Sequence, residues 1–187
     1  MAFSYSFVIA YKLKKGGFME QKIGLITTNR KVLVIFKFFL LLLFFMGCAR
    51  SKVHGFLSNS GSYSDMTVHV SLYSFIFGLD DIYGDISPNM FMIIGFIAFV
   101  FSCISSIAFT LGPSKGSSIA SLIASGISMI GLSPIGVFFG ISQYNSTAHG
   151  TYDHRISINL MPFIIFIILI IMFVCEYRIH KSYQELS

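Results

Sequence analysis

Four long apolar segments alternate with polar segments along the chain. They cover residues 32–49, 90–111, 117–141 and 160–175, and Lys37 is the one charged residue inside them. About 20 apolar residues in a helix rising ~1.5 Å per residue cross a hydrocarbon core ~30 Å thick. The pattern therefore predicts an all-α integral membrane protein built as a four-helix transmembrane bundle.

The polar segments between these runs are too short for separate domains, which typically hold about 100 residues. We expect one membrane domain over residues 32–176, with outer loops at 50–89 and 142–159. Residues 1–31 and 177–187 are then an N-terminal and a C-terminal tail.

Composition agrees with this class, because 55% of the residues are hydrophobic and 11% are charged. A soluble domain carries about 25% charged residues. The net charge is +5, but the basic residues are distributed according to the side of the membrane on which each polar segment lies. They do not form one basic surface that would bind nucleic acid. The basic residues concentrate before the first run, between the second and third, and after the fourth. The positive-inside rule thus places both termini in the cytoplasm of a multi-pass protein, which we expect in the plasma membrane.

The first outer loop contains a strand-like alternation of apolar and polar residues at Thr67–Leu72. A similar alternation at Arg155–Leu160 lies in the second outer loop. We expect these two segments to pair in a small extracytoplasmic β-sheet. Surface segments or extensions of the helices are the alternative interpretation.

The first run has two interpretations. Basic residues followed by Phe38–Met46 and Gly47-Cys48-Ala49 also fit a cleaved signal or a lipoprotein-like signal, and Met19 is a second candidate start. We favour an uncleaved span in which Lys37 snorkels to the headgroups. No disulfide is expected, because the three cysteines fall at different depths.

Spans two and three are joined by the short turn Gly112–Gly116, so they must pack as antiparallel neighbours. Both carry small residues every four positions, which lets helix backbones approach closely in lipid. The predicted packing residues are Ala98, Ser102, Ser106, Ser117, Ser121, Ser125, Gly136 and Gly140. We expect them to pack within one chain, with Pro134 kinking span three.

The spans as bounded contain no acidic residue, so a proton-coupled secondary transporter is disfavoured. No catalytic motif is present, and we predict no enzyme activity, no cofactor and no metal centre. The turn holding Asp80, Asp81 and Asp85 would attract cations, although its spacing does not match an EF-hand. Asn145 begins a glycosylation sequon on the predicted outer side.

The layout of cytoplasmic termini, a longer first outer loop with strands, a short cytoplasmic turn and a smaller second outer loop resembles the claudin and peripheral myelin protein superfamily. The resemblance covers roughly residues 32–176 and rests on architecture, including the small-residue span at Ser117–Ile141. The family's Gly-Leu-Trp signature and loop cysteine pair are absent, since the chain has no tryptophan and reads Phe77-Gly78-Leu79-Asp80.

We therefore expect a non-enzymatic tetraspan that acts in cell–cell contact or as an accessory subunit of a channel or other membrane complex. Its partners would be the lipid bilayer and other membrane proteins, including further copies of itself. The alternative is a small bacterial-type permease or channel component whose first segment is a cleaved signal.

Overall fold

The computed structural model describes the backbone of residues 2–57, 62–81, 84–147 and 155–185, and the side chains of residues 21–49, 69–78, 86–142 and 158–185. Its helices are α1 (Ala2–Leu43), α2 (Leu72–Phe77), α3 (Met90–Leu111), α4 (Lys115–Gly131), α5 (Pro134–Thr147) and α6 (Met161–Gln184). Its strands are β1 (Gly47–Leu57), β2 (Ser62–Ser71), β3 (Leu79–Asp81), β4 (Gly84–Ile86) and β5 (Arg155–Ile158).

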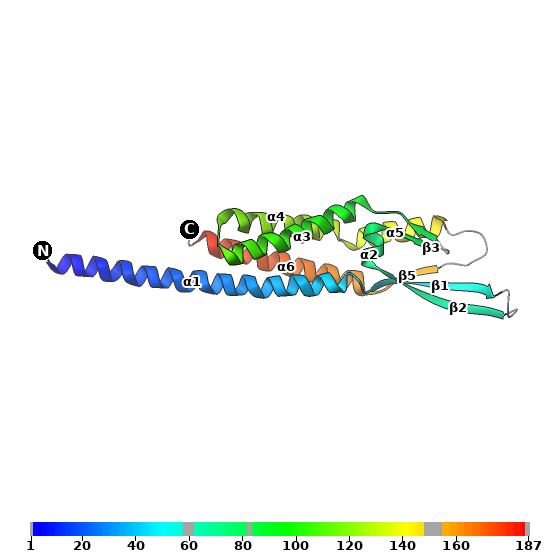
Figure 1. Cartoon of the computed structure of the whole chain (residues 1–187), viewed down its shortest axis with the longest axis horizontal. Helices are drawn as coiled ribbons and strands as arrows, with labels where there is room; N and C mark the ends of the chain where they lie inside the picture. Colours follow the sequence, from blue (N-terminus) through cyan, green and yellow to red (C-terminus); the bar gives the residue numbers. More distant parts are fainter. Residues whose placement is uncertain (1, 58–61, 82–83, 148–154, 186–187) are drawn as a thin grey trace.

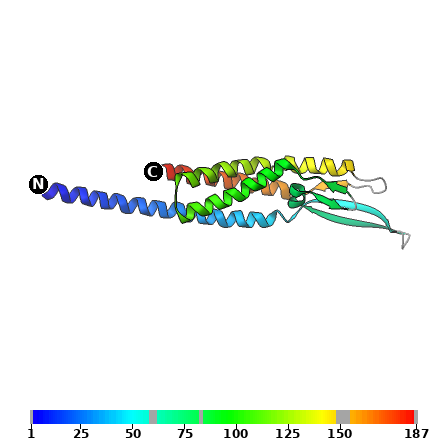
Figure 2. The ribbon, with the colours of Figure 1, turned by 45° about the horizontal axis from the view of Figure 1, so that its top comes forward.

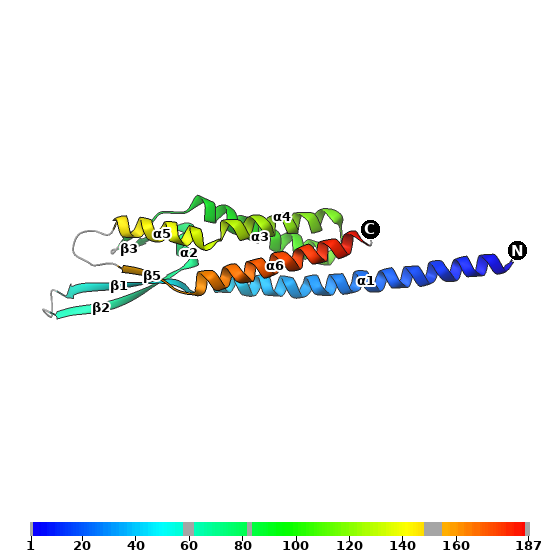
Figure 3. The same ribbon diagram turned by 180° about the vertical axis from the view of Figure 1, so that it is seen from behind.

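The molecule is elongated, with a helical bundle in the middle and the strands at one end (Figure 1). Helix α3 packs against α1 and α4, and α6 also packs against α1 and α4, so the four helices form a ring. The α3–α4 turn and the C-terminus lie together at the end opposite the strands, and the N-terminal part of α1 extends beyond them (Figures 2 and 3). We call these two ends the turn end and the sheet end.

Three helical stretches of the described chain are long and apolar enough to cross a membrane: Met90–Leu111, Lys115–Ser142 and Met161–Gln184. Their buried faces are lined mostly by small and apolar residues, with Glu176 and His180 also buried on α6, while isoleucines and phenylalanines point outward. Outward apolar side chains suit a lipid environment, where no polar face is needed. The chain is therefore compatible with a multi-pass membrane protein.

The helix bounds differ from the predicted spans at both ends of the chain. Helix α1 runs from Ala2 to Leu43, so residues 2–31, which were expected to form an N-terminal tail, are the first part of this helix. Gly47–Ala49, at the end of the first predicted span, belong to strand β1. Helix α6 continues to Gln184, so residues 177–184 extend the helix beyond the predicted span. At its end Tyr183 donates a hydrogen bond to the Pro113 carbonyl of the α3–α4 turn at 3.2 Å.

The strands form two small sheets. One is three-stranded with the order β2-β1-β5, and the other is the hairpin β3-β4. Both expected strand segments are strands, but their direct pairing was wrong, because β1 lies between β2 and β5. Residues 47–57 show no regular alternation, and they fall in the predicted span 32–49 and the predicted outer loop 50–89.

The third predicted span is broken where a kink was expected. Helix α4 ends at Gly131, and α5 begins at Pro134. Proline lacks a backbone N–H and its ring clashes with the preceding turn, so the helix cannot continue through this point. The two parts together still cover Lys115–Ser142.

Helices α3 and α4 are in direct backbone contact at Gly95 and Gly131. A Cβ atom added to Gly95 would lie 2.7 Å from the Gly131 carbonyl carbon, and one added to Gly131 would lie 2.5 Å from the Gly95 Cα. Neither glycine was among the predicted packing residues. Their contact sets the separation of the two helices.

The three cysteines are free in the structure. Cys48 is fully buried where β1 leaves α1, whereas Cys103 and Cys175 are half-buried. Burial raises the pKa of the Cys48 thiol to about 11, partly offset by a backbone hydrogen bond from Leu72. Its thiolate, which is the reactive form, is therefore scarce at neutral pH.

We expect Cys48 to resist alkylation in the folded protein for this reason. In a variant carrying Cys103→Ala and Cys175→Ala, maleimide labelling at neutral pH should be slow when folded and complete after denaturation, as measured by intact mass. Fast labelling of the folded variant would contradict the burial of this thiol.

Candidate functional site

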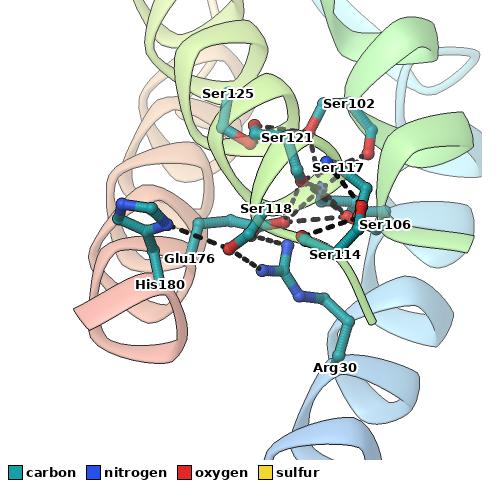
Figure 4. A network of polar contacts seen from close by, with 11 residues as sticks. Arg30, Ser102, Ser106, Ser114, Ser117, Ser118, Ser121, Ser125, Glu176 and His180 are labelled. Carbon is teal, nitrogen blue, oxygen red and sulfur yellow. Dashed lines mark hydrogen bonds and ion pairs between the residues drawn. The ribbon is translucent and has the colours of Figure 1, made fainter. Parts of the chain in front are cut away.

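Three charged side chains lie inside the ring of helices near its turn end. Arg30 and Lys37 come from α1, and Glu176 comes from α6; all three have no exposed surface. Figure 4 shows the carboxylate of Glu176 with Arg30 and serines of α3 and α4 around it. We call this group, with Ser102, Ser106, Ser118, Ser121, Ser125 and His180, the buried polar network.

The two cations are buried because they occupy core positions of α1. The buried residues of this helix are spaced alternately four and three apart, which is the repeat of a helix packed along one seam. These positions are Ile26, Arg30, Leu33, Lys37 and Leu40, and the buried Phe44 continues the spacing directly after the helix ends. Glu176 stands in a similar series on α6, made by Ile165, Leu169, Met172, Glu176 and Ile179.

The ammonium group of Lys37 is fully satisfied by partners on three helices. It donates to Glu176 Oε1 at 2.6 Å and to the hydroxyls of Ser102 and Ser106 at 2.5 and 2.8 Å. The Ser102 carbonyl and the Ser121 hydroxyl lie slightly farther away, at 3.2 and 3.4 Å. Lys37 therefore ties α1 to α3, α4 and α6 at one point.

Glu176 accepts from both sides. Its Oε1 receives hydrogen bonds from Ser106 at 2.9 Å and Ser121 at 2.7 Å, in addition to Lys37. Its Oε2 accepts from the Arg30 guanidinium. A buried carboxylate is stable only when it is paired and hydrogen-bonded, and Glu176 is both.

Arg30 is less completely satisfied. Its Nη2 donates to the Ser118 hydroxyl at 3.2 Å, and its guanidinium carbon lies 4.6 Å from the centre of the Phe109 ring. The latter is a cation–π contact, which strengthens when water is excluded. Its Nε has no hydrogen-bond partner.

Ser118 of α4 connects Arg30 of α1 to His180 of α6. The Ser118 oxygen accepts from Arg30 Nη2, and it lies 3.0 Å from His180 Nδ1. Which of these two atoms donates depends on the tautomer of the imidazole. Through Ser118, α4 is therefore hydrogen-bonded to both α1 and α6.

Serine pairs extend the network toward the sheet end. The hydroxyls of Ser106 and Ser121 are 2.7 Å apart, and those of Ser102 and Ser125 are 2.6 Å apart. Ser128 continues the line one turn further, where its buried hydroxyl has no partner. The network thus occupies the turn-end half of the bundle.

The predicted packing residues separate into three groups. Four of the serines, Ser102, Ser106, Ser121 and Ser125, are buried in the network. Ala98 and Ser117 are only half-buried. Gly136 and Gly140 face Met92 and Phe75, whose side chains would lie 2.6 and 2.5 Å from an added Cβ.

Two predictions about charge were wrong. Glu176 is an acidic residue within a helix that can span a membrane, because α6 extends past the predicted limit at residue 175. Lys37 turns inward to this acid and does not snorkel. The alternating three- and four-residue spacing that puts Arg30, Lys37 and Glu176 in register with buried apolar residues was the signal that could have revealed them.

The acidic turn and the sequon are only partly described. Asp80 and Asp81 lie in β3 and Asp85 in β4, with Asp80 opposite Asp85 in the hairpin. Asn145 lies in α5. Their side chains are outside the described residues, and among those that are described no cluster of metal-binding side chains occurs.

The buried polar network carries a surplus of positive charge, since two cations face one carboxylate. Burying a charge without a partner costs several kcal/mol, which makes the pairing decisive for how these helices assemble.

Known protein families and curated proteins were compared with the chain, and none of them matches it.

Proposed function

We propose that this chain is a non-enzymatic four-span membrane protein that acts through its outer strands, in contact between cells or as an accessory subunit of a membrane complex. The observation that carries the proposal is the position of the three-stranded sheet, which projects from the bundle at the end opposite the C-terminus (Figure 1). The architectural resemblance to claudin-like tetraspans supports the same function.

Helix α1 would be the fourth span. Its buried apolar residues from Ile26 to Leu40 belong to the hydrophobic core, and the helix packs along α3 and α6, both of which are candidate spans. The Lys37 side chain forms its hydrogen bonds inside the ring of helices. Because α1 supplies core contacts of this kind, we expect it to remain in the mature protein and not to be removed as a signal. The turn end would then face the cytoplasm, because Lys115, Arg178 and Lys181 lie there.

The outer strands offer backbone groups for binding. In the order β2-β1-β5, β2 is an edge strand, and β1 pairs with β5 only over Ala49–Lys52. Strand edges expose unpaired N–H and C=O groups that bind other extended segments. The acidic hairpin formed by β3 and β4 would add a negative charge to the same face.

Shortening the β1–β2 hairpin tests the proposal. Replacing residues 53–66 with a short Gly/Ser turn should abolish the clustering of proteoliposomes that display the outer face, and the recovery of partners from native membranes. Lys115→Gln, at the opposite end, is the control and should change neither. A shortened protein that folds normally and retains both properties would overturn the proposal.

A second candidate function rests on Lys37 and Glu176. Ionisable residues inside a membrane bundle commonly mark ion or proton pathways, so a small permease or channel component is the alternative. It would make proteoliposomes permeable to protons, and Glu176→Gln would abolish that permeability. If proteoliposomes leak protons no faster than vesicles without protein, this second function is excluded.

A further inference from the structure

A groove runs along the outside of the bundle between α1 and α6 near the turn end. It has a volume of about 340 Å³ and is lined by Asn29, Val32, Leu33, Phe36, Cys175, Arg178 and Ile179. Five of the seven lining residues are apolar or a thiol, and the two polar ones, Asn29 and Arg178, lie on the turn-end side of Phe36 and Cys175 along α1 and α6. The groove therefore has an apolar body and a polar head.

The shape of the groove follows from its lining. Leu33 and Ile179 are buried and form its floor, whereas Val32 and Phe36 are about half exposed and form its rim. In a bilayer these exposed apolar side chains contact acyl chains. The floor continues the hydrophobic core, so an acyl chain would find apolar contacts along the whole groove.

The head of the groove is positively charged. Arg178 is exposed, and none of the ion pairs in the described part of the chain involves it. Behind it the buried polar network carries two cations against one carboxylate. Lys31 and Lys181 are also exposed at this end, with Glu185 as the one exposed acid among the described side chains there.

From these features we infer that the α1–α6 groove binds an anionic phospholipid, with its phosphate at Arg178 and Asn29 and one acyl chain along Phe36 and Cys175. A guanidinium binds phosphate through paired hydrogen bonds, and the Asn29 amide donates another. Basic pockets between helices on the cytoplasmic side suit such headgroups. The inference rests on the proposed membrane placement and not on the outer-face function.

Retention of lipid by the purified full-length protein tests this inference. Mixed micelles would contain phosphatidylglycerol and phosphatidylcholine with identical acyl chains, and native mass spectrometry would count the bound lipids. We expect the wild type to prefer phosphatidylglycerol about fivefold, which corresponds to the ~1 kcal/mol that one basic residue contributes near a charged membrane surface.

Two variants separate the head of the groove from its body. Arg178→Gln should lose the preference, and Val32→Trp should fill the groove and reduce retention of both lipids. Lys115→Gln removes a charge from the same end outside the groove, so it should behave as wild type. A thermal unfolding curve of each variant, recorded in phosphatidylcholine alone, checks that the variant is folded.

Each contrary result overturns the inference. Equal retention of the two lipids by the wild type, a preference that survives Arg178→Gln, or full retention in Val32→Trp would each exclude a phospholipid in this groove. Displacement of the lipid by glycerol 3-phosphate would identify a site for free anions only. Proteoliposome clustering should be unchanged in Arg178→Gln, which separates this result from a failure of the proposed function.

Discussion

Glu176→Gln is expected to be the most destabilising single substitution in this chain. It leaves Arg30 and Lys37 buried in the bundle without a counter-charge, and glutamine replaces a carboxylate oxygen that accepts from three donors with a neutral amide. Removing one partner from a buried ion pair costs about 3–5 kcal/mol. For a chain of this size that corresponds to a fall in melting temperature on the order of 10 °C.

Thermal unfolding of the purified protein in detergent would measure this effect. Tyr177→Phe is the matched control, because Tyr177 is the next residue of α6 and is exposed. Its melting temperature should equal that of the wild type. If Glu176→Gln also melts like the wild type, the buried pairing is not what holds α1 to α6.

Introducing Lys37→Met into the Glu176→Gln variant tests whether the lost stability comes from a buried charge without a partner. Methionine has a similar length and needs no counter-charge, so the double variant should recover part of the stability lost in Glu176→Gln. The coupling between two residues in contact is typically 0.5–3 kcal/mol on an order-of-magnitude scale. Additive losses would indicate that the two side chains act independently.

The second large effect is expected at the contact between α3 and α4. Gly95→Ala places a methyl group 2.7 Å from the Gly131 backbone, which cannot rotate away as a flexible side chain can. The helices must separate, and overpacking of this kind costs about 1–3 kcal/mol. Separation would also stretch the serine hydrogen bonds between Ser102 and Ser125.

Gly116→Ala is the matched control for that substitution. It lies in α4, and an added Cβ meets nothing within 4 Å. Alanine reduces the conformational freedom of the unfolded chain, so this variant should be as stable as the wild type or more stable by about 0.4–1 kcal/mol. Equal melting temperatures for the two variants would refute the close approach of Gly95 and Gly131.

Much of the bundle could be predicted from the order of residues. The apolar runs at 90–111 and 117–141 and the turn between them indicated an antiparallel hairpin, and the structure places α3 and α4 side by side there. A kink at Pro134 was also predicted, because inside a helix proline lacks the backbone N–H and its ring clashes with the preceding turn, and the structure has a break between α4 and α5 there. These features depend on local chemistry.

The strands show where local pattern was insufficient. Alternation identified the segments that became β2 and β5, but β1 between them carries charged and small residues in no regular order. A strand of this kind is fixed by the backbone hydrogen bonds of its two neighbours. Its position in the sheet therefore depends on segments far away in the chain.

By itself, the sequence determined that the protein has long apolar helices, a tight hairpin and small residues on the facing helix surfaces, because these follow from hydropathy and side-chain volume. Only the tertiary structure decided that Arg30, Lys37 and Glu176 meet inside the bundle. Glu176 is separated from Lys37 by 139 residues. A charge is tolerated in a core only when a partner reaches it, and that partner is known only once the helices are packed.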